Sequence, residues 1–156
     1  MTNKIIIVGP GGSGKDFLRK KMVERGFSYG ISFTSRPPRE NEKEGVDYFF
    51  RDDDFFELNK DIFLEIQQFN GWYYGISKGE FEEKNLFILD PKGVKSLSKE
   101  YRSKSFVIYI NPSEEVRVER LKNRNDADNV ERRLKADRED FFQFLDYDIM
   151  IKNEDF

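Results

Sequence analysis

A glycine-rich segment near the amino terminus has the features of a phosphate-binding loop. It reads Gly9-Pro10-Gly11-Gly12-Ser13-Gly14-Lys15, which fits the pattern GxxxxGK, and it follows the apolar run 4–8. Glycines let the backbone curl so that successive N–H groups point inward, and a following helix adds partial positive charge at its first turn. The segment therefore predicts a cradle for a polyphosphate, with Lys15 reaching the β- and γ-phosphates.

The residue that follows this loop departs from the usual pattern. Asp16 stands where a Ser or Thr normally directs its hydroxyl to Mg²⁺. A carboxylate can ligate Mg²⁺ directly, and it can also complement the positive end of the helix that begins here. The sequence leaves both interpretations open.

A second polar segment, 32–39, carries paired arginines. Arg36 and Arg39 flank Pro37-Pro38, so they are held on a stiff, extended stretch from which both guanidinium groups could converge on one dianion. Tyr48 could add a hydroxyl donor. Taken alone, the segment is more typical of a proline-stiffened polar loop.

The histidine and cysteine counts exclude much other catalytic chemistry. The 156 residues include no His and no Cys, so disulfides, thiolate nucleophiles, Cys/His zinc sites and imidazole bases are excluded. Lys+Arg and Asp+Glu number 27 and 30, for a net charge of −3, and this lack of a global basic field argues against a nucleic-acid partner. No apolar run approaches the roughly 18 residues of a membrane span. We therefore expect a cytoplasmic protein without a membrane partner.

The predicted elements that must position these groups are those of an α/β fold. Apolar runs at 4–8, 85–89, 105–110 and 148–151 predict strands, and they alternate with helices predicted at 15–24, 93–101, 113–122 and 129–145. Ser113 is a predicted N-cap. The last helix is expected to align Val130, Leu134, Phe141 and Leu145 on one stripe.

The stretch 32–84 follows a different pattern. Short strands are predicted at 46–50, 63–67 and 72–77, around one helix near 53–60. We interpret this stretch as an insertion beside a mostly parallel main sheet, within a chain of one domain's length.

The order of six sequence blocks resembles the guanylate kinase family from one end of the chain to the other. The blocks are GPGGSGK, SFTSRPPRENEKEGVDYFF, FLEIQQFNGWYYGISK, FILDPKGVKSL, VERLKNRNDADNVERRL and DYDIMIKNEDF, and the middle ones are the most specific. The resemblance implies a single domain, 1–156, with a P-loop parallel sheet and flanking helices. Its core would span about 1–31 and 85–156, with an inserted nucleoside monophosphate-binding subdomain at about 32–84 and a small lid at about 123–131.

The resemblance also implies an activity and an acceptor site. The reaction would be ATP + GMP to ADP + GDP with Mg²⁺, and residues 9–16 would bind ATP. Glu65 would meet the base, because a carboxylate can accept hydrogen bonds from both N1–H and N2–H₂ of guanine. The acceptor's phosphate would be bound by Ser32, Arg36, Arg39, Tyr48 and Tyr74.

The remaining implied roles concern phosphoryl transfer. Asp90 resembles the family's acid near Mg²⁺ and the acceptor, so Asp16 and Asp90 are the candidate metal ligands. Arg124 and Arg133 correspond to lid arginines that close on the transferring group, and with Lys15 they are the predicted catalytic residues. The nucleophile is an oxygen of the acceptor's phosphate group, whose second pKa is near 6. The phosphate is therefore largely ionised at neutral pH, and no protein base is needed.

Several positions depart from the family pattern. Ile76 stands where relatives carry a Ser or Thr that helps to hold guanine, which weakens the expectation of strict guanine specificity. The segment after Asp90 is shorter than usual, a second acid expected two residues beyond it is missing, and the lid between Arg124 and Arg133 is trimmed. Phe156 follows the last predicted strand closely, where family members generally continue into another helix. Together these departures suggest a minimal or specialised member.

Two alternative functions follow from the same residues. The Gly14-Lys15-Asp16 sequence also resembles ribose 1,5-bisphosphate phosphokinases, and another or modified nucleotide is a further possible acceptor. Against the sugar phosphate stand Arg36 and Glu65, which are better matched to a nucleotide. A non-catalytic guanylate-kinase-like binding module is the other alternative, although such modules typically have a degraded phosphate loop.

Overall fold

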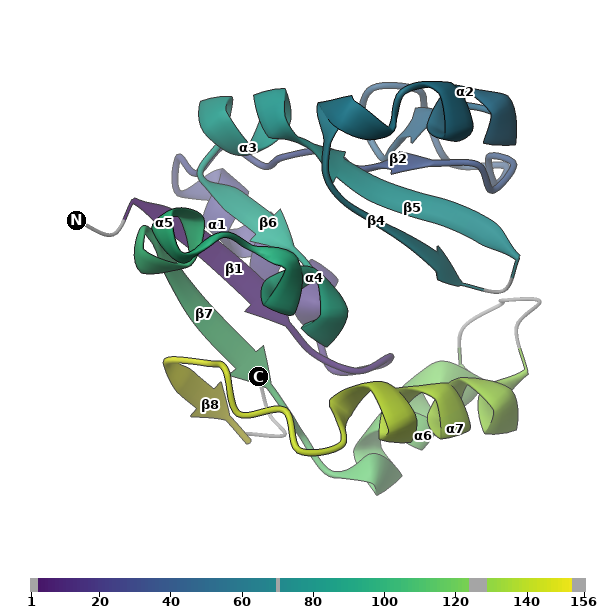
Figure 1. Cartoon of the computed structure of the whole chain (residues 1–156). Helices are drawn as coiled ribbons and strands as arrows, with labels where there is room; N and C mark the ends of the chain where they lie inside the picture. The colour runs from purple at the N-terminus through teal and green to yellow at the C-terminus, as the bar shows by residue number, and fades with distance from the viewer. Residues whose placement is uncertain (1–2, 70, 124–128, 153–156) are drawn as a thin grey trace.

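Two four-stranded sheets form the framework of the computed structural model, which describes residues 3–69, 71–123 and 129–152 (Figure 1). The main sheet has the order β6-β1-β7-β8, and all of its strand pairs are parallel. Its strands are β1 (Lys4–Val8), β6 (Leu86–Ile88), β7 (Ser105–Ile110) and β8 (Ile149–Ile151). The α/β fold with a parallel sheet is thereby confirmed. No helix in the described ranges is long and apolar enough to cross a membrane.

The second sheet is mixed and has the order β3-β2-β5-β4. Its strands are β2 (Phe33–Thr34), β3 (Phe49–Phe50), β4 (Phe63–Phe69) and β5 (Trp72–Ser77). Phenylalanine rings cover one side of it: Phe56, from α2 (Asp53–Leu58), stacks on Phe63 and Tyr73 at centroid distances of 5.0 and 5.1 Å. A short 3-10 helix, η1 (Lys60–Ile62), leads into β4.

The strand predicted at 46–50 is wrong for residues 46–48, because β3 comprises only Phe49 and Phe50. The two-residue strand β2 was not predicted. Gly45 has φ +73°, and its N–H donates to the carbonyl oxygen of Tyr48 at 2.8 Å, so the chain turns here and β3 begins at Phe49. Left-handed backbone favours glycine, and such a turn interrupts a strand that apolar content alone would extend. A two-residue strand such as β2 leaves no periodicity to detect.

Six helices pack around the main sheet and its junction with the second sheet. They are α1 (Lys15–Glu24), α3 (Lys78–Glu83), α4 (Pro91–Ser96), α5 (Lys99–Ser103), α6 (Glu114–Lys122) and α7 (Val130–Phe141). The bounds of α1 match the prediction, and the Ser113 side chain caps α6 by accepting the N–H of Val116 at 3.3 Å. The helix α3, which Ser77 caps, was not anticipated.

The helix expected at 93–101 is two helices in the structure. Leu97 is extended, with φ −65° and ψ 139°, and Ser98 caps α5 by accepting the N–H of Tyr101. A Ser side chain that bonds to the backbone two or three residues ahead competes with helix continuation. The first helix starts earlier than predicted because Asp90 caps it and Pro91 occupies its first turn.

The last helix is also shorter than predicted, because it ends at Phe141. Phe142 has ψ 120° and Gln143 has φ +54°, so the chain leaves the helical path before Leu145. Leu134 is buried as expected, but Leu145 is 78% exposed and is not part of the apolar stripe.

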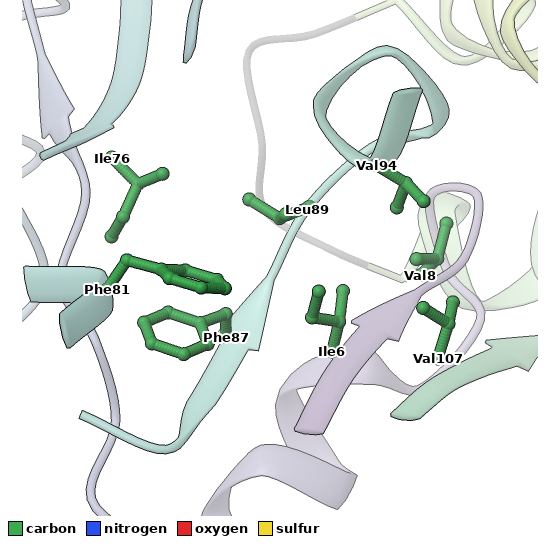
Figure 2. Close-up of a cluster of buried hydrophobic side chains, with 8 residues drawn as sticks. All are labelled: Ile6, Val8, Ile76, Phe81, Phe87, Leu89, Val94 and Val107. Atoms are coloured by element: carbon green, nitrogen blue, oxygen red, sulfur yellow. The ribbon is translucent and has the colours of Figure 1, made fainter. Parts of the chain in front are cut away.

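One buried cluster joins the two sheets (Figure 2). It combines Ile6 and Val8 of β1 with Phe87 of β6, and it reaches Ile76 on β5 of the second sheet. Phe81 of α3 lies between them, stacked on Phe87 with a centroid distance of 4.6 Å. This contact fixes the second sheet at one end of the main sheet, so the edges that face away from the cluster are left to form a cleft.

The tight packing around Phe87 generates a stability prediction. A Cβ at Gly30 would lie 2.2 Å from Cε1 of Phe87, which is 1% exposed and cannot withdraw. We expect Gly30→Ala to lower the free energy of unfolding by about 1–3 kcal/mol, measured by urea denaturation.

The matched control is Gly79→Ala in α3, where the nearest atom to an added Cβ is Ser77 Oγ at 4.0 Å. This change should leave stability unaltered or raise it by up to about 1 kcal/mol, because Ala has the higher helix propensity. Equal stability of Gly30→Ala and wild type would contradict the packing argument.

Candidate functional site

A cleft of about 680 Å³ is lined by residues of the phosphate loop, the second sheet and α7. Figure 1 shows the second sheet and α7 on either side of the carboxyl ends of β1 and β6. This end of a parallel α/β sheet is where ligands usually bind. All predicted site residues line it except Gly9 and Pro10, which lie in the same loop, and Arg124, which lies outside the described residues. From the predicted set the lining includes Gly11, Gly12, Ser13, Gly14, Lys15, Asp16, Ser32, Arg36, Arg39, Tyr48, Glu65, Tyr74, Asp90 and Arg133.

The phosphate loop follows β1 and curls into the first turn of α1. Gly12 and Gly14 have φ of +76° and +101°, which is left-handed backbone that favours glycine. A Cβ at Gly12 would lie 2.8 Å from the carbonyl oxygen of Arg117, so α6 closes off the outer side of the loop. Lys15 folds back within the loop and donates from Nζ to the carbonyl oxygen of Gly9 at 2.6 Å.

Side chains from α6 and α7 hold this loop from outside. The N–H of Gly11 donates to Asp137 Oδ2 at 3.0 Å, and Arg120 Nη1 donates to the carbonyl oxygen of Gly12 at 3.1 Å. Arg133 lies one helical turn before Asp137 and faces the cleft. Asp137 and Arg120 were not among the predicted site residues, although the spacing of four from Arg133 places Asp137 on the same helix face.

The two candidate metal ligands line the same cleft. Asp16 lies in the first turn of α1, with its side chain 65% exposed and Oδ1 at 3.4 Å from Arg19 Nε. Asp90 ends the segment after β6 and caps α4. In the described part of the chain, no three Asp or Glu residues are grouped so that they could together hold a metal ion. Two carboxylates suit Mg²⁺, which keeps several waters and takes its other oxygens from substrate phosphates.

Arg36 is positioned by an acidic residue that the sequence analysis missed. Its Nη1 and Nη2 donate to Glu42 Oε1 and Oε2 at 2.8 and 2.9 Å, and the backbone N–H of Arg39 donates to the same carboxylate at 2.8 Å. Burial alone would raise the pKa of Glu42, but the hydrogen bonds from Arg36 and Arg39 hold it below its usual value. Glu42 therefore stays ionised and fixes the arginine segment. Its only sequence signal is a carboxylate three residues after Arg39.

Aromatic residues form the wall beside these arginines. The Tyr48 ring lies under the Arg36 guanidinium at 5.3 Å and approaches the Tyr74 ring edge-on at 6.2 Å. Burial raises the pKa of the Tyr48 hydroxyl, so it is a neutral donor at physiological pH. Thr34 Oγ1 donates to the carbonyl oxygen of Tyr73 at 2.9 Å, which ties the arginine segment to β5. The two arginines and two tyrosines thus face one part of the cleft.

Next to this wall, the cleft holds a carboxylate pair joined by an amide, since Gln67 of β4 pairs directly with Tyr74 of β5. Gln67 Nε2 donates to Glu65 Oε2 at 2.9 Å and to Asp90 Oδ1 at 2.5 Å. Burial raises the pKa of Glu65 to about 7, and the charge of Asp90 contributes to the increase. Glu65 was a predicted site residue, whereas Gln67 was not. The alternation of side chains along a strand could have indicated Gln67, because residues two apart on β4 face the same side as each other.

Ile76 does not line the cleft. It is 1% exposed, pairs directly with Glu65 between β4 and β5, and belongs to the buried cluster between the sheets. The residue that departs from the family pattern is therefore buried beside Glu65 and brings no polar side chain to this part of the junction.

Comparisons with known proteins give the same assignment along the whole chain. A family model described as guanylate kinase matches residues 1–156. Guanylate kinases of Mycoplasma genitalium and Legionella pneumophila (strain Paris) are 34% and 36% identical to it, over 97% and 99% of this chain and 69% and 79% of their own lengths. The crystal structure of guanylate kinase from Anaplasma phagocytophilum superposes with a TM-score of 0.75, at 24% identity, covering 98% of this chain and 77% of that one. The fold, the loop and these relatives together place the chain in the guanylate kinase family.

Proposed function

We propose that this protein transfers the γ-phosphoryl group of ATP to GMP and releases ADP and GDP. The observation that carries the proposal is that a single cleft contains the phosphate loop, the paired arginines and a buried carboxylate. Each corresponds to one part of the reaction: a triphosphate, an acceptor phosphate and a guanine base. The relatives named guanylate kinase provide independent support.

In the proposed reaction, the second sheet binds the acceptor. Arg36, Arg39, Ser32, Tyr48 and Tyr74 hold the phosphate of GMP, and Glu65 accepts hydrogen bonds from N1–H and N2–H₂ of guanine. The region 32–84 is thereby the acceptor-binding insertion, within a core of about 1–31 and 85–156, and about 123–131 is the lid.

ATP lies along the phosphate loop. Its phosphates accept hydrogen bonds from the loop N–H groups, and Lys15 exchanges its bond to the Gly9 carbonyl oxygen for phosphate oxygens. Asp16 and Asp90 are the residues that would hold Mg²⁺, which neutralises charge on the β- and γ-phosphates when it is bound. Both substrates are available in the cytoplasm, where we place the protein.

The chain's own residues then act by position and charge. The attacking oxygen belongs to the acceptor phosphate, which is largely ionised at neutral pH because its second pKa is near 6. Lys15 and Arg133, which line the same cleft, stabilise the charge that develops during transfer. Closure of the proposed lid would exclude water. The absence of His and Cys costs this reaction nothing.

The first prediction from the proposed function concerns Lys15. Lys15→Ala should lower kcat by about 100-fold or more, because it removes a preorganised cation from the developing charge. Lys20→Ala, a change to an exposed lysine on the same helix, is the control and should stay within about twofold of wild type. Activity is measured as GMP-dependent ADP formation. Full activity in a folded Lys15→Ala variant would rule out the proposed role.

The second prediction tests the acceptor. ADP formation is measured with GMP, dGMP, AMP, UMP, dTMP and ribose 1,5-bisphosphate. We expect the highest kcat/KM with GMP or dGMP, because Glu65 pairs with the guanine edge and not with that of adenine. If only ribose 1,5-bisphosphate stimulates ADP formation, the sugar bisphosphate is the acceptor and GMP is not. If GMP binds but no acceptor stimulates ADP formation, the protein is a binding module.

The third prediction concerns pH. The carboxylate of Glu65 must be ionised to accept both guanine N–H groups, and burial raises its pKa to about 7. The KM for GMP should therefore rise as pH falls from 8 to 6.

Glu65→Gln is the control for this pH dependence, because it keeps the titration of the GMP phosphate and loses that of residue 65. Its KM should be higher than that of wild type and should vary less between pH 8 and 6. Parallel profiles for the two proteins would assign the dependence to another group.

A further inference from the structure

We propose that Gln67 is a positioning residue for guanine recognition, whose side-chain amide orients the Glu65 carboxylate and fixes it relative to Asp90. The inference rests on the proposed function, because Glu65 is taken as the group that reads the base. It assigns a role to a side chain whose type and place on β4 had no function in the sequence analysis.

The amide of Gln67 lies between the two carboxylates. The same nitrogen donates to Glu65 Oε2 at 2.9 Å and to Asp90 Oδ1 at 2.5 Å. An NH₂ group has two hydrogens, so each can serve one carboxylate. This arrangement offsets part of the repulsion between two acidic groups on neighbouring elements, which otherwise would turn away from each other.

The acceptors on both sides are themselves held in place. Asp90 Oδ1 also accepts the N–H of Gly93 at 2.7 Å as the N-cap of α4, so the acidic group is fixed to the first turn of this helix, shortly after the main-sheet strand β6. A Cβ at Gly93 would lie 3.4 Å from Gln67 Nε2, which shows how closely the amide packs on the first turn of α4. Glu65 is held by its strand, because it pairs with Ile76 of β5. Gln67 thus connects a group of the second sheet to a group of the main sheet across the end of the cleft.

This connection bears directly on base recognition. Glu65 can accept N1–H and N2–H₂ of guanine only if both carboxylate oxygens lie in the plane of the base, and a single rotation about its terminal torsion misaligns them. The bond from Gln67 to Oε2 removes that freedom while it leaves other lone pairs of the carboxylate for guanine. With Ile76 buried in the interior, the polar lining on this side is supplied by Glu65 and Gln67 of β4 and by Asp90.

The test variant is Gln67→Met, which keeps the length of the side chain and removes both donors. The KM for GMP should rise about tenfold, in keeping with a lost hydrogen bond to a charged group, while kcat and the KM for ATP should stay within about threefold of wild type. Gln68→Met is the matched control, because Gln68 is exposed and lies outside the cleft lining, and it should leave all constants unchanged. Gln67→Ala provides a second variant if the Met side chain prevents folding, which urea denaturation would reveal.

A base-specific readout separates positioning from general damage. IMP keeps N1–H and lacks the 2-amino group, so misorientation of Glu65 should raise the KM for GMP more than the KM for IMP. The preference of wild type for GMP over IMP should therefore narrow in Gln67→Met. In a Glu65→Gln background the same substitution should have an effect under about twofold, because the partner through which it acts has changed.

The outcomes distinguish this inference from the proposed function. Suppose that wild type phosphorylates GMP and that Gln67→Met has the wild-type KM for GMP and the wild-type preference for GMP over IMP. The positioning role is then wrong, and the proposed function stands. If the effect of Gln67→Met persists in full in the Glu65→Gln background, Gln67 acts through another group and the inference is equally wrong. If wild type itself does not phosphorylate GMP, the proposed function fails first.

Discussion

The buried contact between the two sheets is the constraint on which the rest of the structure depends. Ile76, Phe81 and Phe87 close one end of the junction and are each at most 1% exposed, so the second sheet cannot approach the main sheet more closely or slide along it. Protein interiors are packed at crystal-like density, and such a contact transmits position as well as stability. The width of the cleft at the far end follows from it, and so do the places of the groups that line the cleft.

Charge inside the cleft is held by partners that belong to the protein. Arg36 is locked on Glu42, and Glu65 and Asp90 share the amide of Gln67. The buried Arg36 contributes little net stability through its pair with Glu42, because desolvation cancels most of the attraction. The effect of these partners is to keep each group in one orientation, which is the form of preorganisation that stabilises developing charge without rearrangement during the reaction.

The sequence was most informative where local chemistry dictates local structure. The phosphate loop, the α1 bounds and the Ser113 cap depend on residues within a few positions of one another, and each was predicted. The two helices in 91–103, the early end of α7 and the turn at Gly45 depend on single backbone torsions that a periodicity does not record. Glu42, Gln67 and Asp137 were missed for a different reason, since their roles exist only once distant elements meet.

The missed residues have a common physical character. Glu42, Gln67 and Asp137 hold groups that face the cleft: Arg36, the Glu65–Asp90 pair and the Gly11 N–H. A substrate-facing group has a residue type set by the ligand, so a motif can reveal it. A supporting group has a type set by the shape and charge of its neighbours, and several residue types can meet that need. Ile76 stands where relatives carry a Ser or Thr, and the polar Gln67 lies on the adjacent strand. Both features are therefore consistent with the proposed reaction, because a supporting residue can differ from the family pattern while the reacting groups keep their arrangement.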